Sequence, residues 1–216
     1  MGEAEAGNAG GAAGSGDDPK HRVFESDRRG DRACRPASPL VLGSARPGDR
    51  PEEELAGYRR ALQWVFSRKG PVQITTDVIC RLHALAQGGH SGDAGEWKRR
   101  NNEIVEILPS GDRRIRFVPT SARETPKEIA LLCRSYQEAC QDERVPPLLL
   151  VATFIFDFLC VHPFRDGNGR VSRLLTTLLL KTNSFEIARY ISEERLVEDR
   201  KDEYYGILQY VFGRVA

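Results

Sequence analysis

The chain has 216 residues, of which 40% are hydrophobic and 29% charged, so it can bury one sizeable core with tails. Its 32 basic residues nearly cancel its 31 acidic ones, which excludes a global field that would draw it onto nucleic acid or an anionic membrane. The five cysteines lack CxxC spacing, and the N-terminus lacks the apolar segment of a secretory signal. We therefore expect a cytoplasmic protein with neither a nucleic-acid nor a membrane partner.

The first 50 residues are predicted to form a flexible low-complexity tail. They are rich in Gly, Ala, Pro, Arg and Asp and show scarcely any apolar periodicity, so burial could not offset their ordering entropy. The apolar pattern changes at residue 51. Residues 51–216 are therefore expected to form the folded domain.

Two helices are predicted to begin this domain. Apolar residues recur at helical spacing between Leu55 and Phe66, until Lys69-Gly-Pro71 stops them. The second helix can be capped by Thr75 or Thr76 and ends at Gly88-Gly89.

A β-hairpin is predicted next. Short apolar runs at residues 104–108 and 115–118 flank the turn-forming segment Pro109-Ser-Gly-Asp112. The hairpin interrupts an otherwise helical pattern, so the expected fold is all-α with one small hairpin.

Further helices are predicted beyond the hairpin. Thr125-Pro-Lys-Glu128 has the pattern of a capping box with proline at the first helical position, and Pro146-Pro147 starts the next helix. Because residues 148–161 are apolar nearly all round, we expect that helix at the centre of the domain. Another helix is predicted over about residues 170–181, and one or two more within 192–208.

A polar loop separates the two most hydrophobic predicted helices, and its sequence is HPFRDGNGRVSR, residues 162–173. Such a loop, with two glycines before a helix N-terminus, leaves backbone N–H groups unpaired and lets an anion approach them closely. The pattern predicts a phosphate-binding cradle. Phe164 is expected to anchor the loop in the core.

The polar side chains of this loop suggest a nucleotide site. Arg170 and Arg173 are three residues apart on one predicted helix face, where they can clamp more than one phosphate. Asp166 offers the hard carboxylate oxygen that Mg²⁺ prefers, and Asn168 offers an amide donor for a phosphate oxygen. His162 is the side chain best able to accept a hydroxyl proton near neutral pH.

Each feature also has an ordinary structural explanation. A histidine after an apolar helix is usually structural, Arg–Asp pairs are usually solvated, and Gly-Asn-Gly is often only a turn. Their joint occurrence within one loop between buried helices favours the functional interpretation.

The segment 162–173 resembles the Fic family signature HxFx(D/E)GNGRxxR and matches it at every specified position. The resemblance extends from about Tyr58 to Leu208 and includes Gly95-Glu-Trp-Lys98 and Asp202-Glu-Tyr-Tyr205. It implies a mainly helical Fic fold with one small β-hairpin flap, and a Fic catalytic domain over residues 51–216.

The resemblance implies a protein adenylyltransferase that moves AMP from ATP to a Ser, Thr or Tyr hydroxyl of a target protein, with self-modification expected. His162 takes the part of the motif histidine, which deprotonates the hydroxyl that attacks the α-phosphate. Asp166 takes the position that holds Mg²⁺ on the α- and β-phosphates. The implied ATP-binding residues are Gly167, Asn168, Gly169, Arg170, Arg173, Tyr204 and Tyr205.

The family's flap aligns the target segment by strand addition, and the implied target-binding residues are Ile104, Val105 and Glu106. Tyr204 and Tyr205 resemble the pair that borders the nucleoside site in the family. Simple core packing is the alternative explanation for these two tyrosines.

Other functions remain open. Some Fic relatives use another nucleotide or phosphate-containing donor, and those that transfer phosphate typically carry a lysine in place of the second glycine, so Gly169 favours AMP over phosphate. A nucleotide-binding interaction module without turnover is a second alternative, although binding alone needs no base such as His162. A zinc hydrolase is disfavoured because the other three histidines lie in no ligand spacing.

Many Fic proteins carry an inhibitory helix, (S/T)xxxE(G/N), whose glutamate pairs with the second motif arginine. Residues 20–50 lack this spacing. Thr182-Asn-Ser-Phe-Glu186 has the threonine and glutamate, but it follows the motif helix, where the family has ordinary scaffold. We therefore expect activity without release, restraint by a separate inhibitory partner, or a chain that lacks a piece of its natural sequence.

Overall fold

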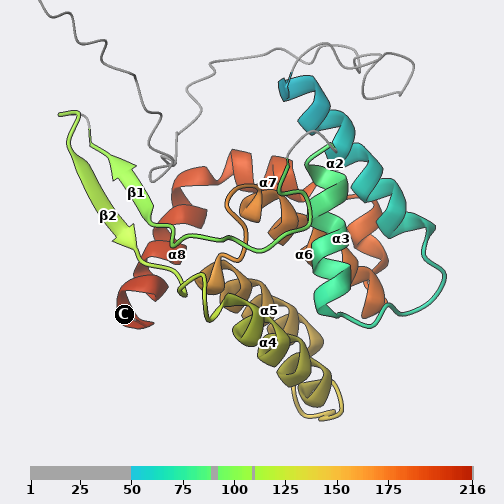
Figure 1. The fold of residues 1–216 in the computed structure, drawn as a ribbon. Helices are drawn as coiled ribbons and strands as arrows, with labels where there is room; N and C mark the ends of the chain where they lie inside the picture. The colour runs from blue at the N-terminus through green and yellow to red at the C-terminus, as the bar shows by residue number, and fades with distance from the viewer. Residues whose placement is uncertain (1–49, 89–91, 109, 216) are drawn as a thin grey trace, which may run out of the picture.

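The computed structural model describes residues 50–88, 92–108 and 110–215, so the predicted tail lies outside the described residues except for Arg50. The described part is mainly helical and carries one small antiparallel sheet (Figure 1), which confirms the expected fold class. In chain order the elements are α2 (Arg50–Ser67), α3 (Thr76–Ala86), β1 (Ile104–Ile107), β2 (Arg113–Phe117), α4 (Thr125–Ala139), α5 (Pro147–Val161), α6 (Asn168–Thr182), the 3-10 helix η1 (Glu186–Arg189), α7 (Glu193–Asp199) and α8 (Lys201–Val215). None of these helices combines the length and apolar character needed to cross a bilayer.

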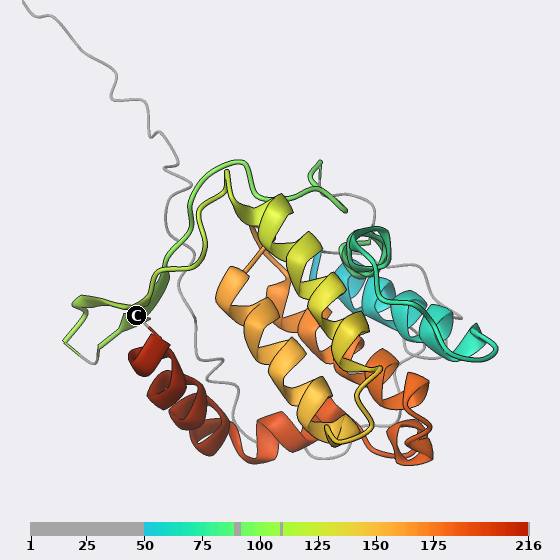
Figure 2. The ribbon, with the colours of Figure 1, turned by 90° about the horizontal axis from the view of Figure 1, so that it is seen from below.

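Helix α6 forms the centre of the fold, with α5, α3 and α2 packed against it (Figures 1 and 2). It can be buried despite its polar residues because their hydroxyls bond to its own backbone. Ser172 donates to the carbonyl of Gly169 at 2.9 Å, and Thr177 donates to that of Arg173 at 3.1 Å. Its fully buried apolar side chains are Val171, Leu174, Leu175, Leu178 and Leu179.

The expectation that residues 148–161 form the central helix is wrong. Helix α5 buries Phe154 and Phe158 against its neighbours, but it leaves Leu148 55% and Leu149 54% exposed. Apolar side chains are common on protein surfaces, so an apolar sequence all round does not require burial all round.

The predicted start of α3 is confirmed, because the Thr75 hydroxyl accepts a hydrogen bond from Val78 N at 3.3 Å. The capping box predicted at residues 125–128 is wrong. Thr125 already lies inside α4, and its hydroxyl donates to the carbonyl of Ser121 at 2.8 Å. A turn that begins at Ser121 therefore leads into α4, and Thr125 is the first residue of the helix and not its cap.

The predicted hairpin is present, with Glu106 opposite Arg114 and Ile107 opposite Arg113. The pairing is irregular between Ile104 and Val105. The hairpin projects from the helical body, and β2 lies beside α8 (Figures 1 and 2). The α5–α6 loop therefore opens toward the hairpin and α8.

Candidate active site

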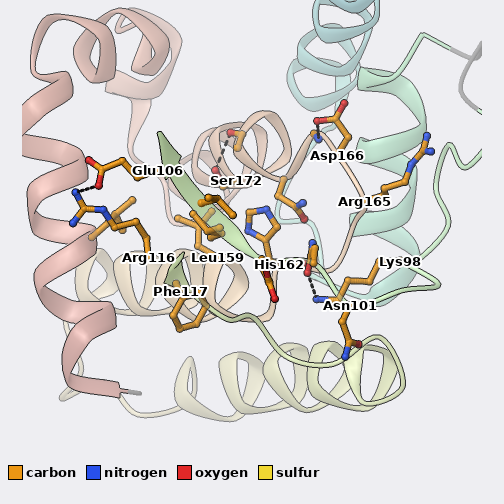
Figure 3. Close-up of a pocket in the computed structure, with 18 of the residues that line it drawn as sticks. Lys98, Asn101, Glu106, Arg116, Phe117, Leu159, His162, Arg165, Asp166 and Ser172 are labelled. Carbon is orange, nitrogen blue, oxygen red and sulfur yellow. Dashed lines mark hydrogen bonds and ion pairs between the residues drawn. The ribbon is translucent and has the colours of Figure 1, made fainter. Parts of the chain in front are cut away.

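A cleft of about 1220 Å³ opens where the α5–α6 loop, the hairpin and α8 meet. In Figure 3, His162 lies between the hairpin side chains Glu106 and Arg116 and the loop residue Asp166. The predicted site residues that line the cleft are His162, Asp166, Gly167, Asn168, Gly169, Arg173, Ile104, Val105, Glu106, Tyr204 and Tyr205. The fold thus brings three separate stretches of sequence to one cavity that is large enough for a nucleotide.

His162 occupies the C-cap of α5 in a left-handed conformation, with φ 49° and ψ 60°. A non-glycine residue adopts this conformation at an energetic cost, so surrounding contacts must hold it there. Its N–H donates to the carbonyl of Phe158 at 2.9 Å. Burial, reinforced by the positive charge of Lys98, lowers the pKa of His162 to about 4, which keeps the imidazole neutral and able to accept a proton.

The imidazole Nδ1 of His162 is buried and has no hydrogen-bond partner within the described part of the chain. The carbonyl of Leu159 and the carboxylate of Asp166 act in the opposite direction to burial and favour the protonated form. A buried ring atom without a partner is costly, and such costs are concentrated at functional sites. The described fold thus leaves Nδ1 of this cleft-lining residue without a hydrogen bond.

Asn168 closes the loop on itself. Its Oδ1 accepts from Phe164 N at 2.9 Å, and its Nδ2 donates to Phe164 O at 2.8 Å, while the side chain is only 2% exposed. In this conformation the amide holds the loop through both backbone groups of Phe164. Phe164 itself is fully buried, which confirms its expected role as the anchor.

His83, one of the three histidines that lie in no zinc-ligand spacing, organises the loop. Its buried ring stacks on Phe164 with 3.8 Å between ring centroids, and its Nδ1 accepts from Gly95 N at 2.9 Å. The other nitrogen, Nε2, then carries the proton and donates to the carbonyl of Asp166 at 3.1 Å. The one signal of this role in the sequence was the place of His83 on the inner face of an amphipathic helix, α3.

The α6 N-terminus faces the cleft. Gly167 is its N-cap with φ 80°, and no side chain caps the first turn. Because the first N–H groups of a helix have no intrahelical partner, this turn can bind an anion. Glycine is required at this cap, since another residue would be strained at that φ and its Cβ would lie 3.1 Å from Gln87 Nε2.

The Asp166 carboxylate suits a magnesium ion. Its Oδ1 accepts from Gly167 N at 2.8 Å, and the residue lines the cleft beside the α6 N-terminus. Among the described residues no group of three His, Cys, Asp or Glu side chains is placed to hold a metal. Phosphate oxygens and water would therefore have to complete the coordination, as Mg²⁺ prefers at nucleotide sites.

The two motif arginines have different ion-pair partners. Arg173 lines the cleft, with its Nε 3.9 Å from Glu194 Oε1 of α7. Arg170 lies outside the cleft lining; its Nη1 is 3.2 Å from Glu54 Oε2 of α2, and its Nη2 is 3.8 Å from Asp166 Oδ2. Residues three apart are turned by about 60° around a helix, which is enough to separate them here. Arg173 thus lines the cleft, and Arg170 lies behind it beside Asp166.

Tyr204 and Tyr205 face the cleft from α8, with 5.2 Å between their ring centroids in an edge-to-face arrangement. Burial raises the pKa of both phenols, so both remain protonated donors at neutral pH. Their position along the cavity wall differs from simple core packing.

Comparison with known proteins gives a family match. The Fic/DOC family profile matches residues 73–180, which is half of the chain and covers α3, the hairpin, the loop and most of α6. The match ends before Tyr204 and Tyr205. Proteins named protein adenylyltransferase Fic from Drosophila erecta and Drosophila melanogaster are each 27% identical over 132 residues, 59% of this chain and 24% of theirs. The chain therefore spans about a quarter of the length of the curated relatives it matches.

Two solved structures share the fold. A Fic domain-containing signaling protein from Bacteroides thetaiotaomicron has a TM-score of 0.61 and 24% identity, covering 80% of this chain and 62% of its own. A Fic family protein from Desulfovibrio desulfuricans has a TM-score of 0.64 and 22% identity, covering 82% of this chain and 51% of its own.

Proposed function

The chain belongs to the Fic/DOC family, and we propose that it is a protein adenylyltransferase that transfers AMP from ATP to a Ser, Thr or Tyr hydroxyl of a target protein. The observation that carries this proposal is one cleft that holds a neutral, buried His162, the Asp166 carboxylate and the open N-terminus of α6. The curated relatives named adenylyltransferases support it. The proposed catalytic unit is residues 51–216.

In the proposed reaction the target hydroxyl oxygen attacks the α-phosphorus of ATP, and the bond to pyrophosphate breaks. The His162 imidazole accepts the hydroxyl proton. The first-turn N–H groups of α6 and the Arg173 guanidinium hold the phosphates, while Tyr204 and Tyr205 border the nucleoside. A Mg²⁺ ion bound to Asp166 would offset phosphate charge when present.

A donor-labelling experiment tests this function. The purified chain would be incubated with Mg²⁺ and a cell lysate, using ATP labelled at either the α- or the γ-phosphate. Relative to lysate without the chain, we expect added protein labelling from the α-label alone. Added labelling from the γ-label would indicate phosphate transfer, and ATP binding without added labelling would indicate a binding module.

The β1 edge is proposed to dock the target segment by strand addition. Because backbone N–H groups alternate between the two edges of a strand, only one of the adjacent residues Val105 and Glu106 directs its N–H outward, and proline at that residue removes an outward donor. Loss of one such hydrogen bond, about 1 kcal/mol, should weaken target binding about fivefold at that position. Titrating the target in a transfer assay measures this loss.

Alanine at the same two positions is the matched control, because it keeps the N–H. Glu106→Ala also controls for the ion pair between Glu106 and Arg116. Equal loss of ATP binding in the proline variants would indicate misfolding and contradict a docking role.

Glu186 is expected to have no inhibitory role. It lies on η1 outside the cleft lining, its side chain is 74% exposed, and its carboxylate is 3.2 Å from Arg189 Nε. The purified chain should therefore modify itself or a target without release, and Glu186→Gly should leave the transfer rate within about twofold of wild type, as for a surface substitution. A large rise in transfer, with an unchanged circular dichroism spectrum, would identify residues 182–186 as an inhibitory element. Two inactive proteins would instead support restraint by a separate partner.

A further inference from the structure

A buried lysine, Lys98, contacts the backbone on both sides of His162, and Figure 3 shows Lys98 and His162 in the same part of the cleft. The residue is only 4% exposed. Its Nζ donates to the carbonyl of Val161 at 2.9 Å, and its backbone N–H donates to the carbonyl of Pro163 at 2.8 Å. Lysine is seldom buried without a specific partner, so its place under the loop requires an explanation.

Asn102 completes this contact. Its Oδ1 accepts from Lys98 Nζ at 2.8 Å, and its Nδ2 lies 3.4 Å from the carbonyl oxygen of His162 and 3.2 Å from that of Phe164. Each of the four consecutive carbonyls of residues 161–164 therefore accepts a hydrogen bond from Lys98 or Asn102. We call these two residues the loop clamp.

The loop clamp acts where the chain leaves α5 and His162 takes its left-handed conformation. The last carbonyls of a helix lack intrahelical partners, so donors from another segment determine how the chain continues. Both clamp residues lie between α3 and β1, shortly before the hairpin. The clamp thus joins the base of the hairpin to the backbone of the catalytic loop.

The clamp also sets the charge beside the imidazole. Lys98 faces His162 from the segment before β1 and disfavours its protonation, while Asp166 on the loop and the Leu159 carbonyl on α5 favour it. Burial lowers the pKa of Lys98 itself to about 8, so the ammonium form still predominates at neutral pH.

We propose that Lys98 and Asn102 are positioning residues for His162, fixing the direction of its imidazole in the cleft through the backbone of residues 161–164. This inference rests on the proposed adenylyl transfer. Neither residue is assigned a contact with ATP or with the target. Both side chains line the cleft, and they act on His162 through the loop backbone and through the charge of Lys98.

The test uses Lys98→Met, which keeps most of the side-chain length but removes the donors and the charge. We expect kcat to fall about 10²-fold, the loss that a small misplacement of a catalytic group can cause, with the Kd for ATP within about twofold of wild type. Lys98→Arg restores a charged donor and should recover part of kcat. A clamp that merely stabilised the fold would instead lower thermal stability and ATP affinity together.

Lys181→Met is the matched control. Lys181 Nζ also donates to a backbone carbonyl, that of Arg68 at 2.6 Å, but it lies outside the cleft lining, so kcat should not change. If Lys98→Met does not fold, Asn102→Ala carries the same test with Lys98 in place. A folded Lys98→Met or Asn102→Ala variant with wild-type kcat would overturn the proposal.

Imidazole NMR separates this proposal from the proposed function, because it needs no turnover. Removing the Lys98 charge should raise the pKa of His162 and shift its ring resonances in the full chain. If wild type transfers no AMP, the proposed function fails, but the NMR measurement still tests the loop clamp. Unchanged His162 resonances in the folded Lys98→Met variant would overturn it.

Discussion

Replacing His162 by alanine should lower AMP transfer about 10²- to 10⁴-fold, the usual contribution of a positioned base, while the fold and ATP binding persist. The reason is local: His162 lines the cleft, its imidazole is held neutral, and its Nδ1 lacks a partner among the described residues. Because the pKa of His162 is lowered to about 4, the base should also stay unprotonated from pH 7 down to about pH 5. Single-turnover transfer across that range measures both effects.

His162→Asn is the matched control for the backbone, since asparagine tolerates the left-handed conformation better than alanine does. Both variants should lose transfer to a similar extent if the imidazole is the base. Wild-type labelling by either variant would remove His162 from that role.

Replacing Asp166 by alanine should weaken Mg²⁺-dependent binding of ATP at least about tenfold and lower transfer with it. Asp166 lines the cleft, one of its oxygens accepts from Gly167 N, and the other lies 3.8 Å from Arg170 Nη2. Calorimetric titration of ATP with and without Mg²⁺ measures the change. The Asp166→Ala variant should bind ATP with the same affinity in the presence and absence of Mg²⁺.

Adding a chelator to wild type is the companion experiment, and it should reproduce the defect of Asp166→Ala. Asp166→Asn keeps the size of the side chain and the acceptor for Gly167 N but loses the charge. It should behave like the alanine variant if the charge holds the metal. Undiminished transfer by wild type in chelator would show that the metal assignment is wrong.

The elements that depend on neighbours in sequence were predictable. The hairpin followed from two apolar runs around a turn, and the start of α3 followed from a threonine with its cap hydrogen bond. The place of Gly167 before the α6 N-terminus was also predictable, because a loop that turns into a helix there needs a residue that tolerates positive φ. These features are encoded over a few residues.

The features that depend on distant contacts were not predictable. The different surroundings of Arg170 and Arg173 depend on Glu54 and Glu194, which lie on different helices. The support of Asp166 by His83 joins residues 83 positions apart and has no spacing that a motif could record. The central position of α6 was not predictable either. The sequence of α5 is apolar nearly all round, so it does not specify which side of α5 the neighbouring helices cover.

The central claim, that the loop beginning at His162 moves AMP onto a protein hydroxyl, is tested most directly by the mass of the modified residue. Purified wild type and His162→Ala would be incubated with ATP and Mg²⁺, and the self-modified or target peptides would be fragmented in a mass spectrometer. We predict adenylate on a Ser, Thr or Tyr side chain with wild type and none with His162→Ala. A phosphate or phosphocholine group on that side chain, or adenylate that persists in His162→Ala, would contradict the account.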